Sequence, residues 1–184
     1  MNTSKKPWDS IPMFPRAHYE IDVGWDYMER QIEHFVESYG LDLDPDYQRA
    51  HVWKKSQQVA YLEYVLKGGE VGRNITFVCK DWNGDNKDFA LLDGKQRLEA
   101  VRQFMAGKLR VFPDHARPEG YCFTDFSGHF RWITHNFKFR VVECATKADI
   151  LRLYLNINAG GTPHTKKELD KVSEMLFDLE AEER

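Results

Sequence analysis

The sequence has few cysteines and no long apolar run, and each shortage argues against a class of protein. The three cysteines, Cys79, Cys122 and Cys144, lie far apart and form no Cys-x-x-Cys pair. We therefore expect neither a disulfide framework nor a thiolate zinc site, and a reducing compartment suits the chain. No segment approaches the roughly 20 apolar residues that cross a bilayer, and the N-terminus lacks a signal-peptide apolar region. We expect no membrane association and a cytoplasmic location, in the host cytoplasm if a phage encodes the protein.

An excess of basic residues is also missing. Lysine and arginine number 26 against 29 aspartates and glutamates, which gives a formal net charge of -3. Because no positive field covers the whole protein, any contact with DNA must come from a local patch. The local basic residues that could contact DNA are Lys54, Lys55, Arg102, Lys108, Arg110, Lys138 and Arg140. The alternative is that they are ordinary solvated surface residues.

What the chain does have is enough apolar material for one domain. Its 184 residues are 42% hydrophobic and 14% aromatic, which supports a single core. Residues 1–23 contain Pro7, Pro12 and Pro15 without a steady period, so we expect an extended N-terminal arm. Residues 24–184 then form the domain, whose first helix is expected to begin with a capping box of Asp26 and Glu29.

The remaining pattern mixes strands with helices and predicts an α+β fold. Residues 75–82 and 87–92 flank Asn83-Gly84, the strongest short signal for a β-hairpin. A helix follows from Lys95, a short strand is possible at 109–112, and residues 137–143 alternate as a strand. Two further helices follow, the first capped by Thr146 and Asp149.

The turn between the hairpin and its helix is the leading candidate for a polar site. Asp93-Gly94-Lys95-Gln96-Arg97 gathers a carboxylate, a cation, an amide and a guanidinium within five residues. It also leaves the free N–H groups of a helix N-terminus available, which suits a phosphate. The alternative is that Asp93 only caps the helix while the two basic side chains are solvated.

Two other stretches place polar side chains between elements. Tyr47-Gln48-Arg49 is either part of a site or a surface turn anchored by Tyr47 and Trp53. Gly160-Gly161 precedes a capping box of Thr165 and Glu168, and forms either a second anion site or a plain loop. Three histidines at 115, 129 and 135 lack metal-ligand spacing, so we treat them as loop residues.

In this order the motifs resemble one family. The motifs are Tyr47-Gln48-Arg49 with Val52-Trp53, the Gln57-Gln58 helix, the Asp93 to Leu98 turn, and Leu155 to Pro163 with Thr165 and Glu168. They look like the DGQQR-motif family, also known as domain-of-unknown-function family 262. This is the ParB/sulfiredoxin-like domain found in the N-terminal part of GmrSD-type restriction enzymes. The resemblance covers roughly residues 40–170. Two departures are expected. Lys95 stands where the family usually has Gln, and we expect no nuclease domain of the kind that follows in GmrSD-like proteins.

The resemblance implies a nucleotide-binding domain that uses ATP or GTP with Mg²⁺. It implies catalytic roles for Asp93, Lys95 and Arg97, with Asp93 also as the metal ligand. Residues implied in nucleotide binding are Gln48, Arg49, Gly94, Gln96, Asn158, Gly160, Gly161 and Thr165. Residues implied in substrate or DNA binding are Tyr47, Trp53, Lys54 and Lys55.

Three functions are compatible with these residues. The first is an NTP-dependent phosphoryl-transfer enzyme, a kinase acting on a hydroxyl in DNA or a modified base, in phage DNA modification, restriction or anti-restriction. The second is an NTPase, or a nucleotide- or DNA-binding module without its own transfer activity, that works with a separate nuclease partner. The third is an interaction protein that has lost the chemistry, and the joint retention of Asp93, Gln96 and Arg97 argues against it.

Overall fold

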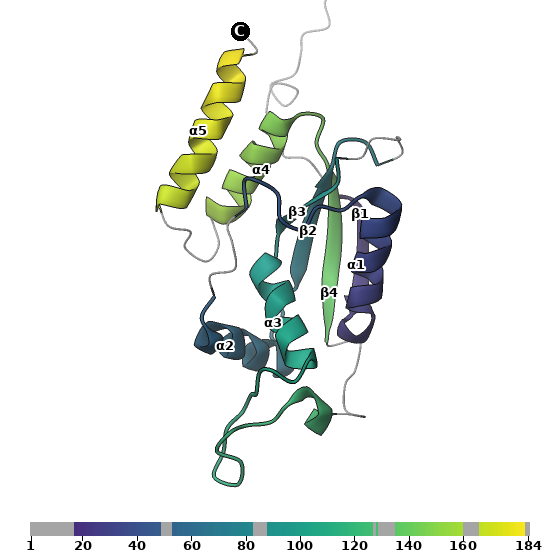
Figure 1. Ribbon diagram of the computed structural model, residues 1–184, viewed down its shortest axis with the longest axis vertical. Coiled ribbons are helices and arrows are strands. Elements are labelled where there is room, and N and C mark those ends of the chain that lie inside the picture. The colour runs from purple at the N-terminus through teal and green to yellow at the C-terminus, as the bar shows by residue number, and fades with distance from the viewer. Residues whose placement is uncertain are drawn as a thin grey trace, which may run out of the picture.

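A four-stranded mixed sheet forms the centre of the protein in the computed structural model (Figure 1). The structure describes residues 17–48, 53–82, 88–126, 128, 135–159 and 166–182. The strands are β1 (Ala17–Gly24), β2 (Asn74–Cys79), β3 (Ala90–Asp93) and β4 (Asn136–Glu143), in the spatial order β1-β4-β2-β3. β4 runs parallel to β2, whereas the other two pairs are antiparallel.

Successive side chains of the two central strands point to opposite faces of the sheet, and both faces are buried. Phe77 and Val141 face one apolar cluster, whereas their neighbours Val78 and Val142 face the other. Such a continuous apolar run is typical of strands covered on both sides.

The larger cluster lies under the first three helices. These are α1 (Trp25–Tyr39), α2 (Lys55–Leu66) and α3 (Lys95–Met105). Phe35 of α1 packs edge-on against Phe77, with ring centroids 5.5 Å apart. The smaller cluster lies under α4 (Lys147–Ala159), against which α5 (Lys166–Glu182) packs in turn.

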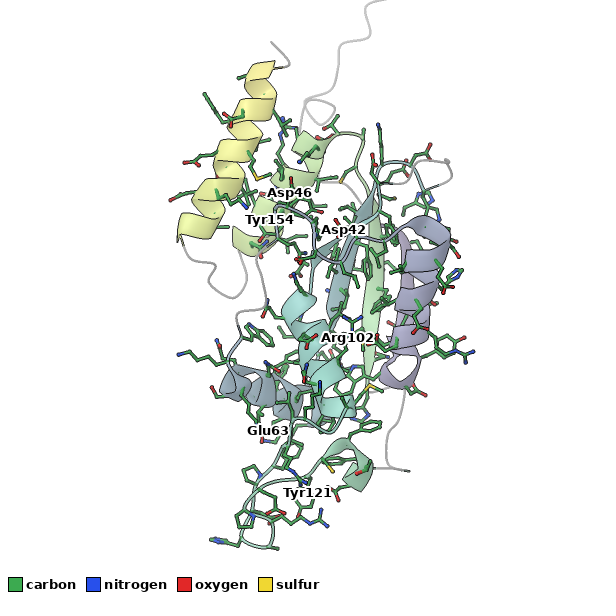
Figure 2. The ribbon with its side chains drawn as sticks, viewed as in Figure 1. Asp42, Asp46, Glu63, Arg102, Tyr121 and Tyr154 are labelled. Atoms are coloured by element: carbon green, nitrogen blue, oxygen red, sulfur yellow. The ribbon has the colours of Figure 1, made fainter. Side chains whose placement is uncertain are left out.

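The segment between α3 and β4 leaves the body of the protein (Figure 1). It contains one short 3-10 turn, η2 (Phe123–Phe126), and an isolated bridge between Val111 and Tyr121. The tip of the segment is tied by polar contacts, among them the hydrogen bond from the Tyr121 hydroxyl to Asp114 Oδ2 at 2.7 Å. Figure 2 shows Tyr121 at this end of the molecule.

The α+β class predicted from the sequence is confirmed, and several local predictions are corrected. Helix α1 starts at Trp25 with Gly24 as its N-cap. The expected capping box of Asp26 and Glu29 is wrong, since no described side chain caps this helix and Glu29 pairs with Arg102. The short strand expected at 109–112 is only the bridge at Val111. Residues 17–23, assigned to the extended arm, belong to β1 and so complete the sheet.

Other predictions agree with the structure. The hairpin expected around Asn83-Gly84 is present as the antiparallel pair β2 and β3, although residues 83–87 lie outside the described part. Thr146 caps α4 by accepting a hydrogen bond from the Asp149 N–H at 3.1 Å. No helix in the described ranges is long and apolar enough to cross a membrane.

Candidate functional site

The turn from β3 into α3 is too tight for any residue except glycine. Gly94 has φ of +109°, a conformation that side chains with a Cβ rarely adopt. A Cβ at this position would lie 2.5 Å from Ile75 Cδ1 and 3.3 Å from Ile75 Cα. Gly94 is also the N-cap, and in the described structure no side chain caps the helix. Asp93 therefore does not act as the side-chain cap that the alternative interpretation required.

Arg97 is held against the turn by several contacts. Its guanidinium forms an ion pair with Asp93, one turn back along the chain, and Nη2 donates to the Asn74 carbonyl at 3.1 Å. The side chain is only 20% exposed, and its buried Nε–H has no acceptor among the described residues. The Nε–H is enclosed, so the exposed fifth of the side chain is the part that a ligand can reach.

Tyr61 of α2 lies near this guanidinium. Its hydroxyl donates to the Gly72 carbonyl at 2.9 Å, and a Cβ at Gly72 would lie 3.4 Å from both Arg97 Cδ and the Tyr61 ring. Burial raises the pKa of Tyr61, and the nearby Arg97 and Arg73 only partly oppose the rise. The phenol therefore stays neutral.

Lys95 faces the segment that precedes α2. Its ammonium pairs with Asp44, whose side chain is largely solvent-exposed, and the Lys95 side chain itself is about one-fifth exposed. A pair with so exposed a carboxylate contributes little free energy. A stronger anion can therefore displace Asp44 at low cost.

Two glutamines tie the flanking chain to the turn. The Gln96 side-chain oxygen accepts the Trp53 N–H at 3.0 Å, and Gln48 Nε2 donates to the Leu91 carbonyl at 2.7 Å. The structure thus brings Gln48 and Trp53 to the β3–α3 turn although each lies 43 residues away in the sequence. Both glutamines bind protein backbone, so their side chains position the site.

The other predicted site residues are less closely grouped. Lys54 and Lys55 are exposed at the N-terminus of α2, next to Trp53. Tyr47 is buried on the opposite side of the sheet, under α4. Asn158 donates to the Tyr154 carbonyl within α4 at 2.7 Å, and none of the described residues of the turn hydrogen-bonds to it.

Four of the predicted residues, Arg49, Gly160, Gly161 and Thr165, lie outside the described residues. The sequence analysis in turn missed Tyr61 and Asp44. Tyr61 lies in the apolar pattern of α2 and carries no signal of its own. Asp44 belongs to the acidic alternation Asp42, Asp44 and Asp46, which was the one available hint.

The residues of the turn can be compared with what a divalent ion requires. Within the described ranges, no group of three His, Cys, Asp or Glu side chains could hold a metal. Mg²⁺ is commonly bound by one or two carboxylates together with substrate phosphates. The single carboxylate of Asp93 fits that arrangement.

Comparison with known families agrees with the motif order. The family model for the GmrSD restriction endonuclease N-terminal domain matches residues 32–173. The chain belongs to this family. The match extends from α1 into α5, so the turn and the stretches that flank it all lie within the GmrSD N-terminal domain. No match was found among curated proteins or among solved structures.

The resemblance inferred from the motifs is thereby confirmed, as is the general link to restriction and DNA modification. The individual roles of Asp93, Lys95 and Arg97 remain predictions.

Proposed function

We propose that this GmrSD-type domain is an NTP-dependent phosphotransferase that binds the nucleotide phosphates at the β3–α3 turn. The observation that carries the proposal is the position of Arg97, a mostly buried guanidinium beside a helix N-terminus that no described side chain caps. Phosphoryl transfer depends mainly on positioning and on charge stabilisation of the transferred group. Arginine supplies both, because its planar, charged guanidinium can donate two parallel hydrogen bonds to the oxygens of one phosphate.

The two ion pairs of the turn suggest how binding begins. Phosphate oxygens would take the donors of Arg97 and Lys95, and would displace the carboxylates of Asp93 and Asp44. Displacement leaves Asp93 able to accept a proton at its carboxylate. Mg²⁺ bound with the nucleotide would add charge neutralisation at the phosphates.

In the transfer itself, a hydroxyl oxygen of DNA or a modified base attacks the γ-phosphorus of ATP or GTP. The bond from the γ-phosphorus to the bridging oxygen breaks, the nucleoside diphosphate leaves, and the hydroxyl proton passes to Asp93. Lys54, Lys55 and Trp53 lie beside the turn, where cations and an aromatic ring suit a nucleic acid. If water replaces the hydroxyl, the same geometry gives an NTPase.

The test follows the label from γ-labelled ATP or GTP with Mg²⁺, with and without plain or base-modified DNA. Label on DNA supports the kinase, and free phosphate supports the NTPase. Label that stays on the nucleotide in every condition contradicts both and leaves a binding module.

The deciding variant is Arg97→Ala, with Arg102→Ala as its matched control. Both arginines belong to α3 and both pair with a carboxylate, but Arg102 binds Glu29 of α1, away from the turn (Figure 2). We expect Arg97→Ala to lower turnover roughly 100- to 1,000-fold, as for loss of one preorganised donor in other enzymes. Arg102→Ala should leave turnover within about twofold, because its pair is a surface salt bridge. Equal turnover in the two folded variants would refute the role of Arg97.

A further inference from the structure

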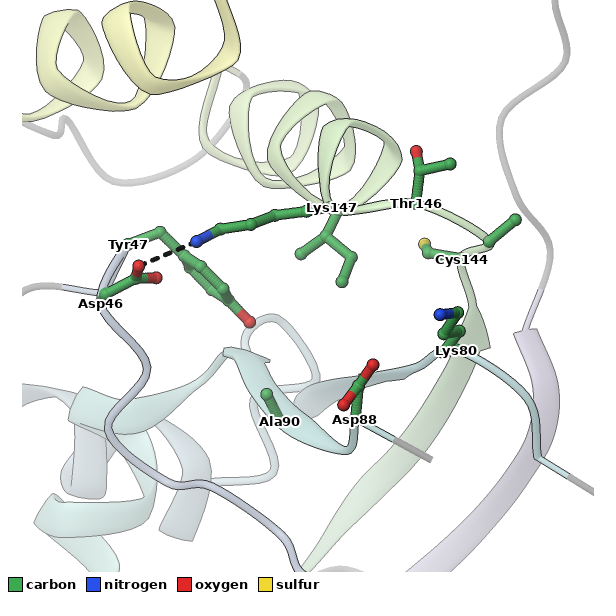
Figure 3. Close-up of a pocket in the computed structure, with 10 residues that line it drawn as sticks. Asp46, Tyr47, Lys80, Asp88, Ala90, Cys144, Thr146 and Lys147 are labelled. Carbon is green, nitrogen blue, oxygen red and sulfur yellow. Dashed lines mark hydrogen bonds and ion pairs between the residues drawn. The ribbon is translucent and has the colours of Figure 1, made fainter. Parts of the chain in front are cut away.

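A pocket opens at the far end of β3 from Asp93. Here β2 and β4 end side by side and α4 begins, so that the pocket lies beyond the carboxyl ends of two parallel strands (Figure 3). Ligands of open sheets with parallel strands favour this edge. The cavity has a volume of about 510 Å³, which is within the usual range for a small-molecule site.

The hydroxyl of Tyr47 is the feature that distinguishes this cavity from an ordinary surface hollow. Tyr47 is 6% exposed, and its hydroxyl has no hydrogen-bond partner among the described residues. Figure 3 shows the hydroxyl aimed into the space between α4 and β3. A buried hydroxyl without a partner costs free energy, so its retention calls for a ligand.

The protonation of Tyr47 suits donation to a ligand. Burial raises the pKa of the phenol, and the carboxylates of Asp42 and Asp46 raise it further. The hydroxyl therefore keeps its proton over the whole physiological range of pH.

The remaining lining combines apolar walls with a polar rim. Ala90, Cys144 and Ile150 supply the walls. Burial raises the pKa of the Cys144 thiol to about 12, so the thiol is neutral and acts as a small apolar group. The rim carries the donors Lys80 and Lys147 and the acceptors Asp46 and Asp88, with Lys147 bonded to Asp46 at 2.9 Å.

We propose that this pocket binds a nucleobase. A base has apolar faces for the walls and an edge that carries both donors and acceptors, which matches the mixed rim and the hydroxyl of Tyr47. The choice of a base over other flat polar ligands rests on the proposed function. β3 spans only Ala90–Asp93, about 10 Å at the usual rise per residue. Tyr47 lies on the opposite face of the sheet from Arg97, so the base belongs either to DNA or to a nucleotide that reaches around the edge strand β3 to place its phosphates at the turn.

The test uses the four deoxynucleosides as probes, with binding to the intact protein measured by titration calorimetry or NMR. Deoxynucleosides lack phosphates and require no turnover, so this result is independent of the kinase assay. Tyr47→Phe should weaken the best-bound deoxynucleoside roughly 5- to 10-fold, the usual worth of one hydrogen bond.

The same variant separates a ligand-binding hydroxyl from a structural one. Because the Tyr47 hydroxyl has no partner within the described structure, Tyr47→Phe should keep or raise the melting temperature, by up to about 4 °C. The matched control is Tyr61→Phe, which removes a hydroxyl that donates to the Gly72 carbonyl and should lower the melting temperature.

A second variant tests the cavity by filling it. Ala145 is exposed on the pocket wall, so Ala145→Trp should block the site without disturbing the core. Deoxynucleoside binding that is lost in Ala145→Trp and weakened in Tyr47→Phe supports the proposal. No deoxynucleoside binding, or binding that neither variant changes, overturns it.

Competition then identifies the source of the base. Displacement of the deoxynucleoside by ATP or GTP, weaker in Arg97→Ala, assigns the pocket to the nucleotide. Displacement by single-stranded DNA alone assigns it to the nucleic acid. Either result supports a base site, and failure of both ligands to compete overturns it.

Discussion

At the scale of single residues, the site depends on one glycine. Gly94 has the positive φ that lets β3 turn directly into α3, and its missing side chain lets Ile75 approach. Both properties place Arg97 and Asp93 on the same side of the turn, where they meet.

Substitution of Gly94 should therefore destabilise the protein strongly. We expect Gly94→Ala to lower the free energy of unfolding by about 2–5 kcal/mol, from the left-handed conformation and the clash with Ile75. Gly107→Ala is the matched control, since Gly107 follows the end of α3 with φ of +72° and no described atom within 4 Å of its Cβ position. Its cost should be only about 1–2 kcal/mol. Denaturant unfolding compares the two, and equal losses would show that the contact with Ile75 is unimportant.

The sequence predicted the turn well because all of its chemistry is local. A strand, a glycine and the start of a helix lie within a few residues, so the spacing of the apolar residues and the residue types of the turn predict all three. The partners of these residues were beyond prediction. Asp44 meets Lys95 across 51 residues, and Gln96 holds Trp53 across 43. Such contacts depend on the packing of α2 and the preceding loop, which no local pattern encodes.

At the scale of elements, α3 controls the start of α2. The Gln96 oxygen accepts the Trp53 N–H just before Lys54, the N-cap of α2. The predicted DNA-binding lysines are therefore positioned by the same helix that would bind phosphate.

Two variants of Gln96 should separate these roles. Gln96→Glu keeps the oxygen that accepts the Trp53 N–H, but its charge should repel phosphate and weaken nucleotide binding about tenfold. Gln96→Ala loses the acceptor and should lower unfolding free energy by about 1 kcal/mol. Melting curves and nucleotide titration measure the two effects. Weaker binding in both variants by the same factor would mean that the charge plays no part.

At the scale of the whole molecule, the charge balance limits how DNA can bind. With a net charge of -3 the protein has no general attraction for polyanions. The predicted patch is small, and its lysines at α2 are exposed on the side of the β3–α3 turn.

The salt dependence of DNA binding should therefore be shallow. A contact through about two to four phosphates gives a slope of log K against log salt near -2 to -4. Lys54→Ala with Lys55→Ala should reduce the slope by about 2, whereas the pair Lys108→Ala and Arg110→Ala, beyond the end of α3, should leave it unchanged. Fluorescence anisotropy at several salt concentrations provides the slopes. A steep slope that does not change when Lys54 and Lys55 are replaced by alanine would show that DNA binds at another surface.

At this scale the sequence patterns predicted the α+β class correctly, but they did not predict the strand β1. The arm interpretation failed for residues 17–23 because an edge strand is stabilised by its neighbour more than by its own composition. Glu20 opposite Arg140 is one such support, with an ion pair at 2.7 Å.

The place of β4 in the sheet has a consequence for how the chain folds during synthesis. β4 lies between β1 and β2, yet it is the last of the four described strands to leave the ribosome. β1 and the hairpin of β2 and β3 therefore have no common neighbour until residue 143 has been translated. Pairing across such a separation is slow because the closing loop costs entropy before any contact forms. The nascent protein must therefore keep two separate sheet edges open until β4 emerges, and that one strand then closes both.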